Sequence, residues 1–143
     1  MIFRKLSKSD LPFLLSSRSL GFLDCWTEEM FLSAFKLQNF GGLIAYEEDK
    51  DVAFITYDKS VDTADIEDVF VIPEYRKKGV ANKLIENLLL TLKEEGIKEV
   101  FLEVRKSNIP AINLYTKSGF NKINERKKYY SNGEDALVFK KEL

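Results

Sequence analysis

Two side chains in the second half of the chain are of types that can move protons. Glu103 stands inside the apolar stretch VFLEVR, and Tyr115 lies in PAINLYTKSGF. A carboxylate in such a strand is costly to bury without a partner, and partial burial raises its pKa toward neutrality, where a general base works best. A tyrosine, with an ordinary pKa of about 10, keeps its proton at neutral pH. The residues alone equally allow Glu103 on a solvent-facing strand, paired with Arg105, and Tyr115 as a core aromatic.

The composition excludes several other kinds of chemistry. The 143 residues contain no histidine, which removes Ser-His-Asp and Cys-His triads and histidine-bearing zinc sites. The one cysteine, Cys25, cannot form an internal disulfide and has no base partner in view, so we expect it to pack beside Trp26. A reducing cytoplasm is the expected location, since the N-terminal MIFRKLSKSD also lacks the apolar stretch of a signal peptide.

The charge and hydropathy of the chain exclude two classes of partner. The formal net charge is −1, so no overall field attracts the protein to nucleic acid or to acidic membranes. The sequence also has no apolar run of the roughly 18 residues that a membrane-spanning helix needs. We therefore expect no nucleic acid and no membrane among the partners.

A cluster of cations marks the stretch PEYRKKGVANKL. Three cations, Arg76 to Lys78, precede Gly79, and a helical pattern begins directly after the glycine. A helix N-terminus carries partial positive charge and unpaired N–H groups, so cations there are unfavourable unless an anion compensates for them. Gly79 permits a positive φ or close backbone approach, and Ala81 keeps the surface shallow. The segment therefore predicts a phosphate or pyrophosphate site, with a solvated basic turn as the alternative.

The elements that position these groups follow from periodicity and turn residues. We expect helices over residues 8–20, 27–38, 79–94 and 109–118, with Thr27 as the N-cap of the second. The predicted order is strand, two helices, three strands, helix, strand, helix and two strands, with no repeat or linker. This order indicates one mixed α/β domain over residues 1–143. Residues 20–40 would be the natural lid.

The cationic turn matches a known signature. Arg76-Lys77-Lys78-Gly79-Val80-Ala81 fits the pattern [Q/R]-x-x-G-x-[G/A], and the chain resembles the GNAT superfamily of N-acetyltransferases over essentially its whole length. The stretches CWTEEMF, LEVRKSNIPAINLYTKSGF and ERKKYYSNGEDAL are similar to the branch that acetylates protein N-termini, typified by the ribosomal-protein alanine acetyltransferases. The resemblance implies a mixed, mostly antiparallel sheet of about seven strands flanked by about four helices.

The resemblance also implies roles for particular residues. Glu103 would be the general base and Tyr115 the general acid in acetyl transfer from acetyl-coenzyme A, a co-substrate, to a primary amine, with no metal required. The strand edge would pair with the pantetheine arm and the turn would hold the pyrophosphate. The implied cofactor-binding residues are Val69, Phe70, Val71, Arg76, Lys77, Lys78, Gly79, Val80, Ala81, Asn82 and Asn108. Asn108 is also explained as a helix N-cap, and Tyr129 and Tyr130 would lie near the amine.

The acceptor remains open between alternatives. The stretch IEDVFV is similar to a strand of polyamine acetyltransferases, so Glu67 or Asp68 is a rival base or substrate anchor. At pH 7, neutralising an α-amine costs about 1.4 kcal/mol and an alkyl amine about 4.6 kcal/mol, which favours a protein N-terminus for one carboxylate base. A polyamine or amino sugar is the alternative acceptor, and a non-catalytic acyl-coenzyme A-binding module is the third interpretation. The oligomeric state is a monomer or a homodimer, and residues 126–128 are expected as a solvated basic run.

Overall fold

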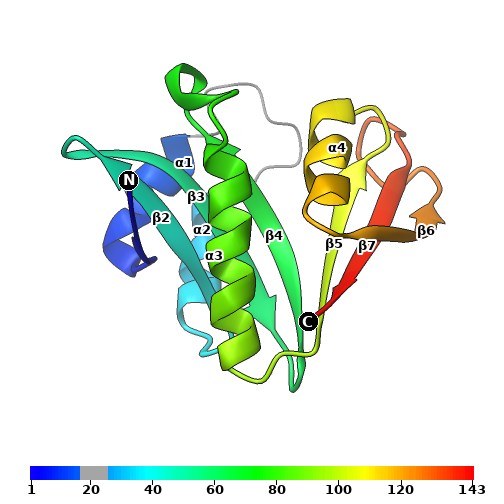
Figure 1. Cartoon of the computed structure of the whole chain (residues 1–143), viewed down its shortest axis with the longest axis horizontal. Coiled ribbons are helices and arrows are strands. Elements are labelled where there is room, and N and C mark those ends of the chain that lie inside the picture. Colours follow the sequence, from blue (N-terminus) through cyan, green and yellow to red (C-terminus); the bar gives the residue numbers. More distant parts are fainter. Residues whose placement is uncertain (17–25) are drawn as a thin grey trace.

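A single sheet organises the computed structural model, which describes residues 1–16 and 26–143 (Figure 1). Its strand order is β1-β2-β3-β4-β5-β7-β6. The strands are β1 (Ile2–Lys5), β2 (Phe40–Glu47), β3 (Lys50–Lys59), β4 (Thr63–Val71), β5 (Glu99–Arg105), β6 (Asn121–Arg126) and β7 (Ala136–Glu142). Neighbouring strands are antiparallel except β4 and β5, which are parallel. The predicted mixed, mostly antiparallel α/β fold is confirmed.

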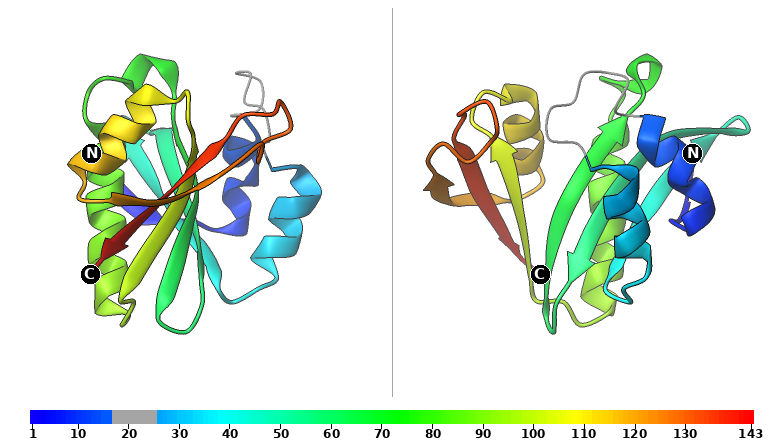
Figure 2. Two further views of the ribbon diagram at one scale, coloured as in Figure 1. Left: turned by 90° about the vertical axis from the view of Figure 1, so that its right-hand side faces the viewer. Right: turned by 180° about the vertical axis from the view of Figure 1, so that it is seen from behind.

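Helices cover both faces of this sheet, as the two views of Figure 2 show. On one face lie α3 (Val80–Glu94) and α4 (Ile109–Lys117), and on the other lie α1 (Leu11–Ser16) and α2 (Glu28–Phe35). Thr27 caps α2 as predicted, because its Oγ1 accepts a hydrogen bond of 3.2 Å from the Met30 N–H. No helix within the described ranges is both long and apolar enough to cross a membrane.

Three of the sequence interpretations fall partly or wholly outside the described residues. The first predicted helix, 8–20, begins as a 3₁₀ turn at Lys8–Asp10 and continues as α1, and its last residues are among 17–25, which the structure does not describe. Cys25 belongs to the same undescribed segment, as does the beginning of the predicted lid.

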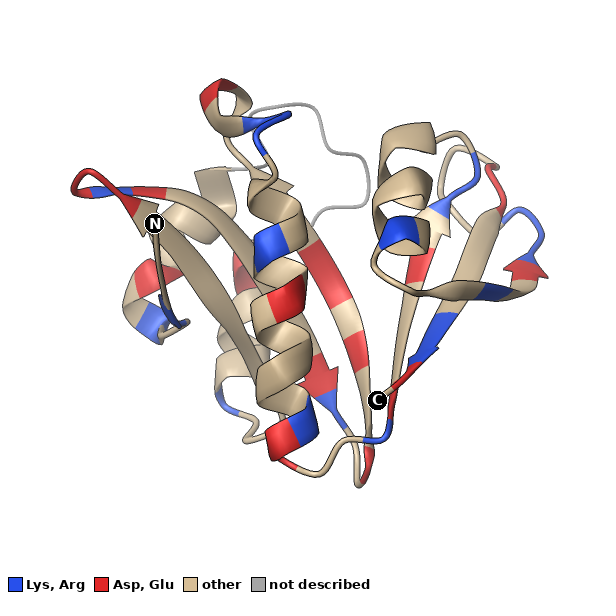
Figure 3. Ribbon diagram, viewed as in Figure 1, with Lys and Arg blue, Asp and Glu red and all other residues tan. Residues whose placement is uncertain are grey.

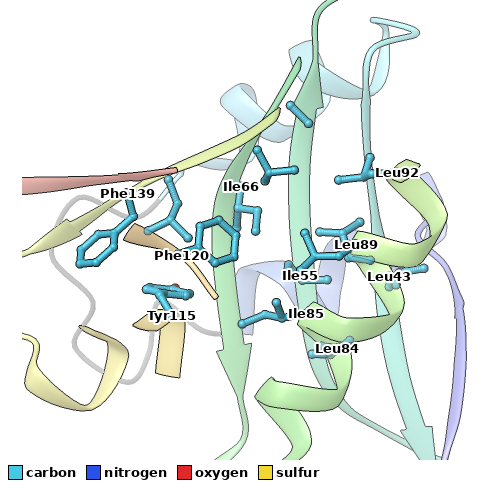
Figure 4. Close-up of a cluster of buried hydrophobic side chains, with 14 of the residues drawn as sticks. Leu43, Ile55, Ile66, Leu84, Ile85, Leu89, Leu92, Tyr115, Phe120 and Phe139 are labelled. Carbon is cyan, nitrogen blue, oxygen red and sulfur yellow. The ribbon is translucent and has the colours of Figure 1, made fainter. Parts of the chain in front are cut away.

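The spacing of apolar residues on α3 explains how the helix is fixed to the sheet. Val80, Leu84, Leu88 and Leu92 recur at helical intervals, and all four are buried. Figure 4 shows the core they join, which continues under α4 through Tyr115, Phe120 and Phe139. Full burial of each such side chain contributes about 1.5–3 kcal/mol of transfer free energy. A second core on the other face comprises Leu14, Phe31, Ile44, Phe54 and Phe70.

A β-bulge interrupts β4 at its centre. Thr56 of β3 lies opposite Asp68, but the next residue, Tyr57, lies opposite Ile66. Glu67 is therefore the extra residue of the bulge, which bends β4 and exchanges the two faces of the strand beyond it.

The sheet divides between β4 and β5. Their pairing runs from Thr63 opposite Glu99 to Ile66 opposite Leu102 and stops there. Beyond this point the two strands diverge, as Figure 1 shows, and the edge of β4 over residues 67–71 does not pair with β5. The bulge lies where the pairing stops, so a free strand edge and a bend coincide.

Candidate active site

Two cavities adjoin where β4 and β5 separate. The larger has a volume of about 680 Å³ and the smaller of about 140 Å³. Five residues line both cavities: Ile66, Glu67, Leu102, Glu103 and Tyr130. Figure 3 shows acidic residues along β4 and β5 at this opening and basic residues on the turn before α3.

Glu103 is held from two sides in the larger cavity. Its Oε2 lies 3.0 Å from Nε of Arg126, and its Oε1 accepts a hydrogen bond of 3.2 Å from the Tyr129 hydroxyl. The Arg126 guanidinium also lies 5.5 Å from the centroid of the Tyr129 ring. The alternative pairing of Glu103 with Arg105 is wrong, since the ion pair of Glu103 is with Arg126.

Glu103 and Tyr115 lie on opposite faces of the sheet. Glu103 alternates along β5 with Leu102 and Val104, whose side chains belong to the core under α3 and α4. Because successive side chains of a strand point to opposite faces, Glu103 points away from that core. Tyr115 belongs to it and lines the smaller cavity.

Two carboxyl groups of β4 have pKa values that are raised toward neutral pH. Desolvation raises the pKa of Glu67 to about 7, and repulsion from Asp65 and Asp58 adds to the effect. Burial raises the pKa of Asp68 to about 6, opposed by the hydrogen bond that its carboxylate accepts from the Val69 N–H. Both predicted rivals of Glu103 therefore lie at the opening, and Glu67 lines both cavities. In residues 1–16 and 26–143, no acidic or cysteine cluster is arranged to hold a metal ion.

Tyr115 has a buried ring and faces the smaller cavity. Its side chain is 8% exposed and packs edge-on against Phe120, with ring centroids 6.1 Å apart. Burial, and next the charge of Asp68, raises the pKa of Tyr115, so the phenol stays protonated. Asn108 lines the same cavity, and its Oδ1 caps α4 by accepting a hydrogen bond of 3.3 Å from the Ala111 N–H. The predicted N-cap is confirmed.

Tyr129 and Tyr130 both line the larger cavity, with their rings edge to face at a centroid distance of 5.3 Å. Arg105 lies over the Tyr130 ring at 4.1 Å. Its Nη1 also donates a hydrogen bond of 3.1 Å to Asn132 Oδ1 and lies 3.7 Å from Glu134. Arg105 therefore orders the segment that carries the two tyrosines, a role that the sequence interpretation did not assign to it.

The cationic turn presents an open backbone at the start of α3. Gly79 is the N-cap residue, with a left-handed φ of 80°, and Lys77 also has a positive φ, of 62°. No side chain caps the helix at Gly79, and a Cβ built there meets no atom within 4 Å. Arg76 is tied back to β4, because its Nε donates a hydrogen bond of 2.8 Å to the Val71 carbonyl oxygen. The first N–H groups of α3 are thus available to an anion.

Several predicted cofactor-binding positions can offer only their backbone. Phe70 and Val80 have buried side chains, and Val69 and Val71 pack against the core. These residues can contribute through N–H and C=O groups, which is the contribution that the resemblance implies for the strand edge.

Two polar side chains at the turn already have partners. Asn82 donates a hydrogen bond of 3.1 Å to Glu86 and accepts one of 3.4 Å from Ser118 at the end of α4. The ammonium of Lys78 lies 5.2 Å from the centroid of the Tyr75 ring. Asn82 therefore links α3 to α4, and Lys78 has a side chain directed over an aromatic ring.

Arg126 is a second residue at this site whose role the sequence interpretation missed. It is exposed, as expected for the basic run 126–128, but it also lines the larger cavity and pairs with Glu103. The strand register carries the signal: Glu103 lies opposite Val138, and Val138 lies opposite Asn124. Arg126 is two residues from Asn124 on β6, so it lies on the same face of the sheet as Glu103. Because β7 runs between β5 and β6, the long Arg126 side chain reaches across β7 to Glu103.

The arrangement suits a group transfer between two substrates that enter from opposite faces. Carboxylates on one side of the divided sheet can accept a proton, and a protonated phenol on the other side can donate one. The open helix N-terminus on the phenol side suits an anionic substrate.

Comparison with known proteins identifies relatives with this architecture. The model of the acetyltransferase (GNAT) family matches residues 11–120. The [ribosomal protein bS18]-alanine N-acetyltransferase of Salmonella typhimurium is 30% identical over 136 residues, covering 93% of this chain and 91% of that protein. An N-alpha-acetyltransferase of Saccharolobus solfataricus is 43% identical over 76 residues, which is 52% of this chain and only 46% of that protein.

A solved structure extends the likeness to the whole fold. The ribosomal-protein-S18-alanine N-acetyltransferase from Escherichia coli superposes with a TM-score of 0.90 at 29% identity. The match covers 99% of this chain and 92% of the other. The family model, the relatives and the shared fold agree, and this chain is a member of the GNAT family of acetyltransferases.

Proposed function

We propose that this protein transfers the acetyl group of acetyl-coenzyme A to the N-terminal α-amine of a protein, such as a ribosomal protein. The observation that carries the proposal is the pair of cavities that adjoin at Glu67 and Glu103, where β4 and β5 separate. The larger cavity is acidic and suits an ammonium group. The smaller cavity adjoins the phenol of Tyr115 and the helix α4. Two relatives support the choice of acceptor: one is named an N-alpha-acetyltransferase, and the other is named for the alanine of ribosomal protein bS18.

The groups on the same face of the sheet as α3 and α4, together with the smaller cavity, fit acetyl-coenzyme A. The open backbone at Gly79 and the uncapped start of α3 suit the pyrophosphate. The edge of β4 over residues 69–71 is paired with β3 on one side only, so its other side can pair with the amides of an extended pantetheine arm. Asn108, beside the smaller cavity, is the proposed side-chain contact.

Two residues of the chain would handle the protons of the reaction. The transfer forms an amide C–N bond and breaks the thioester C–S bond, while the ammonium group loses two protons and the thiolate gains one. Glu103 faces the acceptor side and takes the first proton, which leaves the neutral amine that attacks the carbonyl carbon. The second proton leaves the nitrogen as the amide forms and replaces the proton that Tyr115 gives up. Tyr115, protonated because of its burial, gives its proton to the sulfur on the other side.

A small amine is the second candidate acceptor, and one observation favours it. Asp65 and Glu67 line the same cavity as Glu103, and the pKa of Glu67 is raised to about 7. A cluster of this charge would also attract a polyamine, with Glu67 as the base. The α-amine is favoured because a single carboxylate needs to overcome only about 1.4 kcal/mol to neutralise it at pH 7.

Mass spectrometry after incubation with acetyl-coenzyme A distinguishes the acceptors. The panel holds a peptide with a free N-terminal alanine, the same peptide N-blocked with an internal lysine, and spermidine. We expect acetylation of the free-alanine peptide alone. Acetylation of spermidine alone would contradict the α-amine proposal and support the small-amine function. Binding of acetyl-coenzyme A without acetylation of any amine would contradict both functions.

A further inference from the structure

The contact between Arg126 and Glu103 occupies the carboxylate that the acceptor amine must reach. Arg126 Nε lies 3.0 Å from Oε2, and the Tyr129 hydroxyl holds the other oxygen at 3.2 Å. Both oxygens of Glu103 are therefore engaged in the acceptor-free protein. An incoming ammonium group can approach Glu103 closely only by sharing or replacing one of these partners.

Arg126 is the partner that can be replaced. Its side chain is 55% exposed and that of Glu103 is 33% exposed, so the pair is partly hydrated and little is lost when it opens. The guanidinium also rests on the face of Tyr129, where a second organic cation can be accommodated in the same way. Arg126 thus presents to Glu103 and Tyr129 the same type of charge that an acceptor would bring.

The surrounding charges explain why a cation is needed here before the acceptor arrives. The larger cavity is also lined by Asp65 and Glu67, and Glu103 contributes to the raised pKa of each. Arg126 is the one Lys or Arg among the described residues that line this cavity. Without its charge, the carboxylates would repel one another more strongly, and the cavity would attract any cation.

We propose that Arg126 is a positioning residue that holds Glu103 in the acceptor-free enzyme and is exchanged for the ammonium group of the acceptor. The inference rests on the proposed function. It makes Arg126 an internal competitor, so the enzyme selects amines that interact with Glu103 better than a guanidinium does. The acceptor's affinity, rather than the rate of acetyl transfer, is the quantity that Arg126 controls.

Steady-state kinetics of Arg126→Gln with the amine that the wild-type protein acetylates test the exchange. We expect KM for the acceptor to fall about twofold to fivefold, the range for loss of an exposed ion pair, with kcat changed less than about twofold. Arg126→Lys, which keeps the charge, is expected to restore a KM near that of the wild type. Lys127→Gln is the matched control, because Lys127 is 70% exposed and pairs with Asp135 and Glu125 outside the cavity.

A second measurement separates direct exchange from a general change in charge or fold. Calorimetric binding of the acceptor in the presence of coenzyme A, which allows no transfer, is compared in the Glu103→Gln background with and without Arg126→Gln. In the Glu103→Gln background, Arg126→Gln is expected to give no gain in affinity for the acceptor. The reason is that residue 103 no longer carries the charge for which Arg126 and the ammonium group compete. An unchanged or raised KM in Arg126→Gln, or an equal effect in Lys127→Gln, would overturn the proposal while acetyl transfer itself stands. Absence of acetylation of every amine would instead remove the proposed function and this inference with it.

Discussion

The Nε of Arg76 donates a hydrogen bond of 2.8 Å to the carbonyl oxygen of Val71, the last residue of β4. This bond ties the cationic turn to the strand whose edge is free beyond Ile66. The turn is therefore held beside the free edge of β4, next to the start of α3. A ligand with an anionic end and an extended arm suits this arrangement.

Replacing Gly79 is expected to abolish binding of acetyl-coenzyme A. In Gly79→Glu, the new side chain places negative charge at the helix N-terminus where the pyrophosphate would lie. Gly96→Glu is the matched control, because Gly96 also has a positive φ, of 89°, and an added Cβ also meets no atom within 4 Å. Both variants should lose about 1–2 kcal/mol of stability from backbone strain. Calorimetric titration should show loss of binding in Gly79→Glu only, and equal binding in the two variants would refute the pyrophosphate site.

Removing the hydroxyl of Tyr115 is expected to slow acetyl transfer without unfolding the protein. The ring fills the core beside Phe120, and phenylalanine retains that packing. We expect kcat of Tyr115→Phe to fall about 100-fold or more, the usual range for loss of a general acid, with an unchanged unfolding temperature. Tyr57→Phe is the control, since burial also raises the pKa of Tyr57 but it lines neither cavity. A full rate in Tyr115→Phe would show that another group protonates the thiolate.

Asp68 makes the stability of the protein depend on pH in an unusual direction. Burial raises its pKa from 3.8 to about 6, so the folded state binds this proton more tightly than the unfolded state does. Stability from this group is therefore complete below pH 4 and falls as the pH rises toward 6, where the unfolded chain has released the proton first. The rise in pKa corresponds to at most about 3 kcal/mol, and partial exposure reduces it to about 1–2 kcal/mol.

The Asp68→Asn variant tests this linkage. Asparagine can still accept the hydrogen bond from the Val69 N–H but carries no charge to desolvate. We expect the variant to be more stable than the wild type at pH 8, by about 3–6 °C in unfolding temperature, and the gain to vanish near pH 3.5. Thermal denaturation at both pH values measures the difference. A gain that is the same at both values would mean that packing, not charge, is responsible.

Local sequence signals were sufficient for the helices and for the turn. The apolar spacing from Val80 to Leu92 gives α3 directly, because a helix buries every third or fourth residue. Thr27 and Asn108 marked two helix starts through capping, which depends only on residues three positions away. Gly79 marked the turn because its backbone conformation favours glycine.

The partners around Glu103 could not be predicted, because they depend on strand register. A bulge shifts the pairing of β6 with β7 between Lys122 and Asn124 and so decides which face Arg126 occupies. The bulge at Glu67 has the same effect on β4, because it breaks the simple alternation of faces that a strand prediction assumes. The sequence was therefore sufficient to predict which chemical groups belong to the site. The two β-bulges determine which of these groups pair with one another.

The central claim is that the acceptor amine meets the acetyl group at the divided sheet and gives its proton to Glu103. The measurement that tests it most directly is kcat for the free-alanine peptide at saturating acetyl-coenzyme A, with Glu103→Gln and Glu67→Gln compared side by side. We predict that Glu103→Gln lowers kcat about 100-fold or more, while Glu67→Gln keeps most of it and both bind acetyl-coenzyme A like the wild type. A large loss in Glu67→Gln together with a near-normal rate in Glu103→Gln would contradict this account and assign the base to the bulge of β4.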